Sequence, residues 1–142
     1  MSEQSLNQFP DRYAAAVFAK DVDGLLDLYD GDVRLFDLWV VWAYDGAPAW
    51  RQAVTEWFAS LGDQRVRVAF EDVQTAASGD LASLNATISY NDVDVDGTEQ
   101  KSMQNRLTWV LKKSAGQDWK IAHEHTSAPV DFETSKVILQ RQ

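Results

Sequence analysis

The chain of 142 residues contains no cysteine, which excludes disulfide bonds and any metal or catalytic site built on thiolates. It also lacks a run of about 20 apolar residues, so the sequence predicts no membrane-spanning helix. The N-terminal segment MSEQSLNQFPDRY has no basic start followed by an apolar stretch, which is the pattern of a secretory signal. These absences favour a soluble protein of the cytoplasm.

Positive charge is scarce, because 13 lysines and arginines stand against 22 aspartates and glutamates, giving a net charge of −9. Such a chain repels phosphate backbones and anionic lipid headgroups. We therefore expect no nucleic-acid partner and no membrane surface. Small molecules and protein surfaces remain as partners.

Apolar residues are plentiful at 45%, including six tryptophans, and the length suits one domain over residues 1–142. Segments 6–20, 22–29 and 48–61 carry apolar side chains at helical spacing. Gly31 is placed to end the second helix and Gly62 the third. A strand is expected over DVRLFD, between the second and third helices.

After Gly62 the apolar pattern changes to a period of two. Strands are predicted near 66–70, 81–91, 100–113 and 118–128, with turns at SGD, VDG and SAGQD. This order predicts an α+β fold in which three N-terminal helices pack on a mostly antiparallel sheet. The core spans about residues 6–131, and the short polar tail from Val130 is expected to form one loose helical turn.

Two segments resemble metal sites. His123 and His125 are two apart on a strand, so both point to one face and Glu124 to the other. That face offers no third ligand for zinc. The segment NDVDVDGTEQKSM begins like a calcium loop, but Met103 stands where the bidentate glutamate belongs. We expect a hairpin there, and no metal at either place.

Side-chain alternation on the last two strands assigns residues to faces. If the SAGQD turn pairs Thr108 with Ala122, one face holds the even-numbered residues and Arg106 lies opposite Glu124. Arg106 and Glu124 then form an exposed ion pair worth under about 1 kcal/mol, or they line a cavity wall. The face is expected to contain Gln104, Arg106, Thr108, Val110, Ala122, Glu124 and Thr126.

Asp37 ends the segment DVRLFD, immediately before an aromatic loop. A carboxyl group among apolar rings has a raised pKa through desolvation, as a general base near neutral pH requires. The alternative is a strand-end aspartate that caps a turn. The loop carries Trp39, Trp42 and Tyr44.

Two strings, RYAAAVFAKDVDGLLDLYDGDVRLFD and NRLTWVLKKSAGQDWKIAHEHTSAP, resemble the nuclear transport factor 2-like superfamily, which includes SnoaL-like and ketosteroid isomerase-like domains. The resemblance covers about residues 6–131. It implies a strongly curved sheet that forms a cone-shaped roll with an internal cavity, usually in a homodimer. It also implies that Tyr13 is the oxyanion-hole tyrosine and Asp37 the catalytic base. Arg106 takes the place of the second oxyanion donor.

The resemblance further implies that the even-numbered face, with Thr108, Glu124 and Thr126, lines the cavity. Hydrophobicity alone would bury the odd-numbered face, which contains Trp109, Trp119 and Ile121. Both conditions hold if a second copy covers the odd-numbered face. The sequence therefore predicts a homodimer through the outer face of the sheet.

Two hypotheses of function remain open. In the first, Asp37 is the base of a cofactor-free isomerase, cyclase or dehydratase acting on an apolar carbonyl compound, and Tyr13 and Arg106 stabilise the oxyanion. Trp39, Trp42 and Tyr44 would line the entrance. In the second, the pocket is non-catalytic and recognises a small carboxylate through Arg106, or the chain is an association module. An arginine close to Asp37 would lower the pKa of that carboxyl and weaken it as a base.

Overall fold

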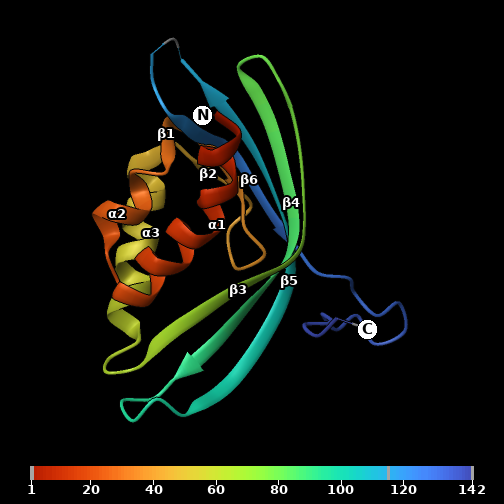
Figure 1. The fold of residues 1–142 in the computed structure, drawn as a ribbon. Coiled ribbons are helices and arrows are strands. Elements are labelled where there is room, and N and C mark those ends of the chain that lie inside the picture. Colours follow the sequence, from red (N-terminus) through yellow and green to blue (C-terminus); the bar gives the residue numbers. More distant parts are fainter. Residues whose placement is uncertain (1, 115, 142) are drawn as a thin grey trace.

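A computed structural model describes residues 2–114 and 116–141 of the chain (Figure 1). Among the described residues, two strands precede the third helix, where the sequence predicted one. The elements are α1 (Ser2–Ala19), α2 (Val22–Leu26), β1 (Tyr29–Phe36), β2 (Tyr44–Asp45), α3 (Ala47–Ser60), β3 (Arg65–Ser78), β4 (Leu81–Val93), β5 (Glu99–Lys113) and β6 (Trp119–Ser127).

The strands form one sheet in the order β2-β1-β6-β5-β4-β3. All neighbouring pairs are antiparallel except β1 and β6, which are parallel. Figure 1 shows long, strongly curved strands β3, β4 and β5, with the helices gathered on one side of the sheet. The sheet is open, since β2 and β3 are its two edges. The predicted α+β class with a curved, mostly antiparallel sheet is confirmed.

Helix α1 covers the sheet with an apolar stripe, as its spacing predicted. Phe9, Tyr13 and Val17 are at most 2% exposed. The Trp109 ring of β5 lies 6.2 Å from that of Phe9 and 5.6 Å from that of Tyr13, centroid to centroid. Aromatic pairs at such distances add to the stability gained from burial. Trp109 therefore helps to hold α1 on the sheet, together with Phe70 of β3, whose ring centroid lies 5.8 Å from that of Tyr13.

Helix α2 is short, and the prediction that Gly31 ends it is wrong. Asp21 caps its start by accepting a hydrogen bond from the Gly24 amide at 3.0 Å. The helix ends at Leu26, and Gly31 lies inside β1. The chain leaves the helix early because Tyr29 already pairs with Ile121 of β6. Tertiary pairing thus outweighs the helical spacing of residues 22–29.

The predicted pairing of the last two strands is also wrong. Glu124 lies opposite Trp109, and Arg106 lies opposite Ser127, so Arg106 does not face Glu124. The register shifts by one residue because Ala122 has no partner on β5. Such an extra residue is a β-bulge, and it reverses which side chains of the strand face the core.

The bulge at Ala122 determines which residues face the helices. Ahead of the bulge Trp119 and Ile121 point inward, and after it Glu124 and Thr126 do so, because all four are at most 4% exposed. On β5 the inward residues are odd-numbered, and Arg106 and Thr108 are exposed on the outer face. The predicted inward placement is therefore correct for Glu124 and Thr126 and wrong for Arg106 and Thr108.

The apolar residues that we expected a second subunit to cover are buried within this chain. Trp109, Trp119 and Ile121 are at most 2% exposed and belong to the main core. The conflict between the two sheet faces, on which the predicted homodimer was based, is thus resolved by the bulge.

The tail contains the single turn that was expected, because the Ser135 amide donates to the Asp131 carbonyl at 2.8 Å, four residues earlier. Around this turn an isolated bridge joins Val130 to Val137, and the chain then returns to β5. The amide of Gln104 donates to the Leu139 carbonyl at 2.7 Å, beyond the point where β6 ends. The tail therefore continues the hydrogen bonding of β5 on the side that β6 leaves free.

The calcium-like segment is a hairpin turn between β4 and β5, as predicted. The Gly97 amide closes it by donating to the Asp94 carbonyl at 2.9 Å.

In the described part of the chain, every helix is too short or too polar to span a bilayer.

Candidate functional site

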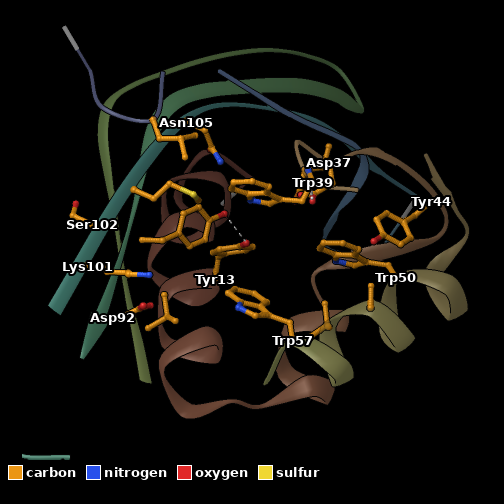
Figure 2. Close-up of a pocket in the computed structure, with 17 residues that line it drawn as sticks. Tyr13, Asp37, Trp39, Tyr44, Trp50, Trp57, Asp92, Lys101, Ser102 and Asn105 are labelled. Carbon is orange, nitrogen blue, oxygen red and sulfur yellow. Dashed lines mark hydrogen bonds between the residues drawn. The ribbon is translucent and has the colours of Figure 1, made fainter. Parts of the chain in front are cut away.

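A pocket of about 580 Å³ lies between the helices and the inner face of the sheet. Figure 2 shows its aromatic side chains arranged around a common space, with Asp37 at its upper end. Helices α1 and α3 contribute Tyr13, Trp50 and Trp57, and β4 contributes Tyr90. The aromatic residues that line it are Tyr13, Trp39, Tyr44, Trp50, Trp57 and Tyr90.

The structure brings most of the predicted site residues together. Tyr13, Asp37, Trp39, Tyr44 and Glu124 all line the pocket. Thr126 lies behind them and contacts Asp37. Arg106, Thr108 and Trp42 are not among the lining residues.

Asp37 follows the last residue of β1 and is held by hydrogen bonds on both oxygens. The Thr126 hydroxyl donates to Oδ1 at 3.3 Å, and the Trp39 amide donates to Oδ2 at 3.2 Å. Burial raises the pKa of Asp37, and these two bonds offset part of that rise. The carboxyl thus caps a turn and lines the pocket at once, so the two interpretations of Asp37 do not exclude each other.

Tyr13 projects from α1 and places its hydroxyl 3.3 Å from the hydroxyl of Tyr90. Burial, followed by the nearby Tyr90 group, raises the pKa of Tyr13 well above its ordinary value. The phenol therefore keeps its proton at neutral pH. A protonated phenol in an apolar pocket is a hydrogen-bond donor for a ligand oxygen.

Glu124 is the most deeply buried carboxyl of the pocket, with 2% exposure. Its Oε1 accepts hydrogen bonds from the Tyr29 hydroxyl at 2.5 Å and the Trp109 indole at 2.9 Å. Burial raises the pKa of Glu124 from 4.5 to about 7, although these two bonds lower it and the charge of Asp37 adds a smaller rise. Within the described chain, Oε2 receives no hydrogen bond.

Arg106 and Thr108 lie on the opposite side of the sheet from Asp37. The Arg106 Nε donates to the Ser127 hydroxyl at 3.2 Å, and both Arg106 and Thr108 are exposed. Arg106 therefore cannot lower the pKa of Asp37 by contact, and the burial of Asp37 determines the direction of its shift. The predicted contact of Arg106 with the cavity is wrong because strand alternation was followed through a bulge.

The aromatic loop divides its tryptophans between two environments. Trp39 lines the pocket, whereas Trp42 is 92% exposed. Between them Val40 is 98% exposed and has a positive φ of 68°, which is strained for a β-branched residue. The change of backbone direction at Val40 separates the two tryptophans. The prediction that Trp42 lines the entrance is therefore wrong.

The two histidines lie on the outer face, away from Glu124 as strand alternation predicted. His123 Nδ1 is 2.7 Å from the Arg34 carbonyl, and the Phe36 ring packs edge-on against both imidazoles. Across the described residues, no group of three histidine or carboxylate side chains converges in a geometry suited to a metal ion.

Several pocket residues were not identified as such by the sequence analysis. Trp50 and Trp57 are seven residues apart on α3, and that spacing, which places both on one helical face, was the available signal. Asn105 is a polar residue between the apolar Met103 and Leu107 on the inner face of β5. Trp50 Nε1 and Asn105 Oδ1 are buried without a hydrogen-bond partner among the residues described.

The pocket and the open curved sheet agree with a known family. The profile of the SnoaL-like domain matches residues 6–131. The chain belongs to the SnoaL-like domain family. No curated protein matches the sequence of this SnoaL-like chain.

Solved structures support the same fold. An NTF2-like protein of unknown function from Pseudomonas putida KT2440 is 27% identical to this SnoaL-like chain, with a TM-score of 0.80. The match covers 99% of this chain and 95% of the other.

Two more distant structures show the fold alone. The protein Aln2 from a Streptomyces species has a TM-score of 0.77 at 11% identity, covering 88% of each chain. An NTF2-like protein with a cystatin-like fold from Novosphingobium aromaticivorans has a TM-score of 0.73 at 14% identity, covering 88% of this SnoaL-like chain and 80% of its own.

Proposed function

We propose that this SnoaL-like domain is a cofactor-free acid–base enzyme that moves a proton at the carbon beside a carbonyl group of an apolar small molecule. One observation carries the proposal: Asp37, a carboxyl whose pKa is raised by burial, lines the same pocket as the hydroxyl of Tyr13. Enolisation requires a base and a neutral hydrogen-bond donor, and the raised pKa makes the Asp37 carboxylate a stronger base than an exposed one.

In the proposed reaction, the carboxylate of Asp37 takes the proton from the α-carbon. The C–H bond breaks, an O–H bond forms on Asp37, and the electron pair moves onto the carbonyl oxygen. Tyr13 donates a hydrogen bond to that oxygen, and the adjacent Tyr90 hydroxyl supports the donor. If the ketone is β,γ-unsaturated, return of the proton from Asp37 to the γ-carbon gives isomerisation. If the enolate attacks a second carbonyl of the same molecule, a C–C bond forms and the oxygen of that carbonyl takes the proton from Asp37, which gives cyclisation.

The rival proposal, a non-catalytic pocket for a small carboxylate, has less support. It was based on Arg106, which is exposed on the outer face of the sheet. Among the described lining residues the one cation is Lys101, whose side chain is exposed. A carboxylate ligand would instead lie beside Asp37 and Glu124, which repel it.

Exchange of α-protons tests the acid–base proposal without knowledge of the natural substrate. The neutral ketone 4′-tert-butylacetophenone is incubated with the protein in deuterated water. Loss of the proton signal of its acetyl methyl group is followed by NMR. We expect the protein to accelerate exchange and Asp37→Asn to lower that acceleration by about 100-fold or more, because the amide cannot accept the proton.

Asp63→Asn is the matched control, since Asp63 is exposed and outside the pocket. It should exchange the ketone at the rate of the unchanged protein. Equal rates for Asp37→Asn and the unchanged protein would refute the assignment of Asp37 as the base.

A further inference from the structure

We propose that the pocket recognises a ligand with a positively charged nitrogen on an aromatic or apolar body, that is, an organic ammonium ion. The proposal deepens the proposed function, because it names a class of substrate for the pocket that contains Asp37. It rests on three observations: the carboxyl groups of the pocket, the free oxygen of Glu124, and the aromatic walls.

The first observation is that the carboxyl groups of the pocket have no counter-charge. Asp37, Asp92 and Glu124 line it, and none of the ion pairs in the described part of the chain includes them. Lys101, the cation among the described lining residues, is exposed. A buried carboxyl group without a counter-charge favours its neutral, protonated form. A ligand cation would supply the counter-charge and stabilise the carboxylate form.

The second observation is the orientation of Glu124. Its Oε1 is occupied by the hydrogen bonds from Tyr29 and Trp109, whereas Oε2 has no such partner in the described chain, although the residue is only 2% exposed. An ammonium ion in the pocket would give this oxygen a partner. The ionisable groups around Glu124 are Tyr29 from β1, Asp37 immediately after β1, Tyr13 from α1 and Tyr90 from β4, none of which becomes positively charged.

The third observation is the aromatic wall. Figure 2 shows Trp39, Trp50 and Trp57 around the same space, with Tyr13 between them. The faces of tryptophan and tyrosine rings attract cations, by about 2 kcal/mol or more when water is excluded. Rings together with carboxylates are the usual means of binding ammonium groups, and 580 Å³ is enough for a small aromatic ligand.

Three para-substituted acetophenones test the effect of charge, and the first two are matched in shape. They are the cation (4-acetylphenyl)trimethylammonium, its neutral isostere 4′-tert-butylacetophenone, and the anion 4-acetylbenzoate. Each is titrated at pH 7 and binding is measured by quenching of tryptophan fluorescence. We expect the cation to bind at least about tenfold more tightly than the neutral isostere and the anion to bind most weakly.

The pH dependence gives a second readout in the unchanged protein. Because the ammonium ion favours the carboxylate form of Glu124, its binding should release protons and tighten from pH 6 to pH 8. A neutral ketone that accepted a hydrogen bond from protonated Glu124 would show the opposite trend. In Glu124→Gln the preference for the cation should fall to about threefold or less, while the exposed control Glu133→Gln should keep it.

The proposal is overturned if the neutral isostere binds as tightly as the cation, or if the anion binds most tightly of the three. If Glu124→Gln fails to fold, the pH trend of the unchanged protein decides. The two proposals fail separately. If the exchange depends on Asp37 but the cation is not preferred, only the acid–base proposal stands. If the cation binds tightly but no exchange is seen, only the ammonium site stands.

Discussion

At the residue scale, Glu124 makes the stability of the fold depend on pH. The folded protein holds the Glu124 proton up to about pH 7, whereas the unfolded chain releases it near pH 4.5. Between these values the folded state binds more protons, so raising the pH through this window lowers the free energy of unfolding. The loss attributable to Glu124 is on the order of 3 kcal/mol. In Glu124→Gln, whose amide oxygen can still accept from Tyr29 and Trp109, this loss should disappear. Urea denaturation at pH 5 and pH 8 measures it.

The expected result is that Glu124→Gln exceeds the unchanged protein in stability at pH 8 and not at pH 5. Glu133→Gln is the control, because Glu133 is exposed in the tail. If Glu124→Gln and the unchanged protein lose the same stability between the two pH values, Glu124 is not the group responsible.

At the element scale, the bulge of β6 allows one strand to serve both the core and the pocket. Deleting Ala122 should restore regular alternation and force either Trp119 and Ile121 or Glu124 and Thr126 to the outer face. Moving two buried apolar side chains into water costs about 1.5–3 kcal/mol each. We expect the deletion to lower the free energy of unfolding by at least about 3 kcal/mol, or to prevent folding, as measured by thermal denaturation.

The substitution Ala122→Ser is the matched control, because it changes the side chain and keeps the number of residues. It should cost less than about 1 kcal/mol. A deletion variant as stable as this control would show that the bulge does not determine the register.

The same bulge marks the limit of the sequence analysis. Tyr13 and Asp37 could be predicted because each is identified by its local string and lies within or beside one element. Arg106 and Thr108 could not, because their placement depends on a one-residue irregularity in the neighbouring strand. Ala122 has no sequence feature that distinguishes it from an ordinary strand residue. Trp50 and Trp57 lie seven residues apart on α3, a spacing that indicates one helical face, but it does not reveal that this face borders a pocket.

At the scale of the whole molecule, the α+β class was predictable because the change from helical spacing to a period of two at Gly62 extends over many residues.

We still propose a homodimer through the outer sheet face, which presents Phe36 with His123 and His125. Sedimentation equilibrium at micromolar concentration should give twice the 16.0 kDa of one chain. Phe36→Asp should shift the mass towards one chain, whereas Val73→Asp, on the distant strand β3, should not. A single-chain mass for the unchanged protein would contradict the proposal.

The C-terminal tail reaches the pocket. Leu139 contributes to the pocket lining, yet it follows residue 131, the last residue shared with the SnoaL-like profile. Two relatives that share Asp37 and Tyr13 can therefore accept molecules of different length if their final residues differ. Ligand choice can then evolve in those final residues without change to the two groups proposed to act on the ligand.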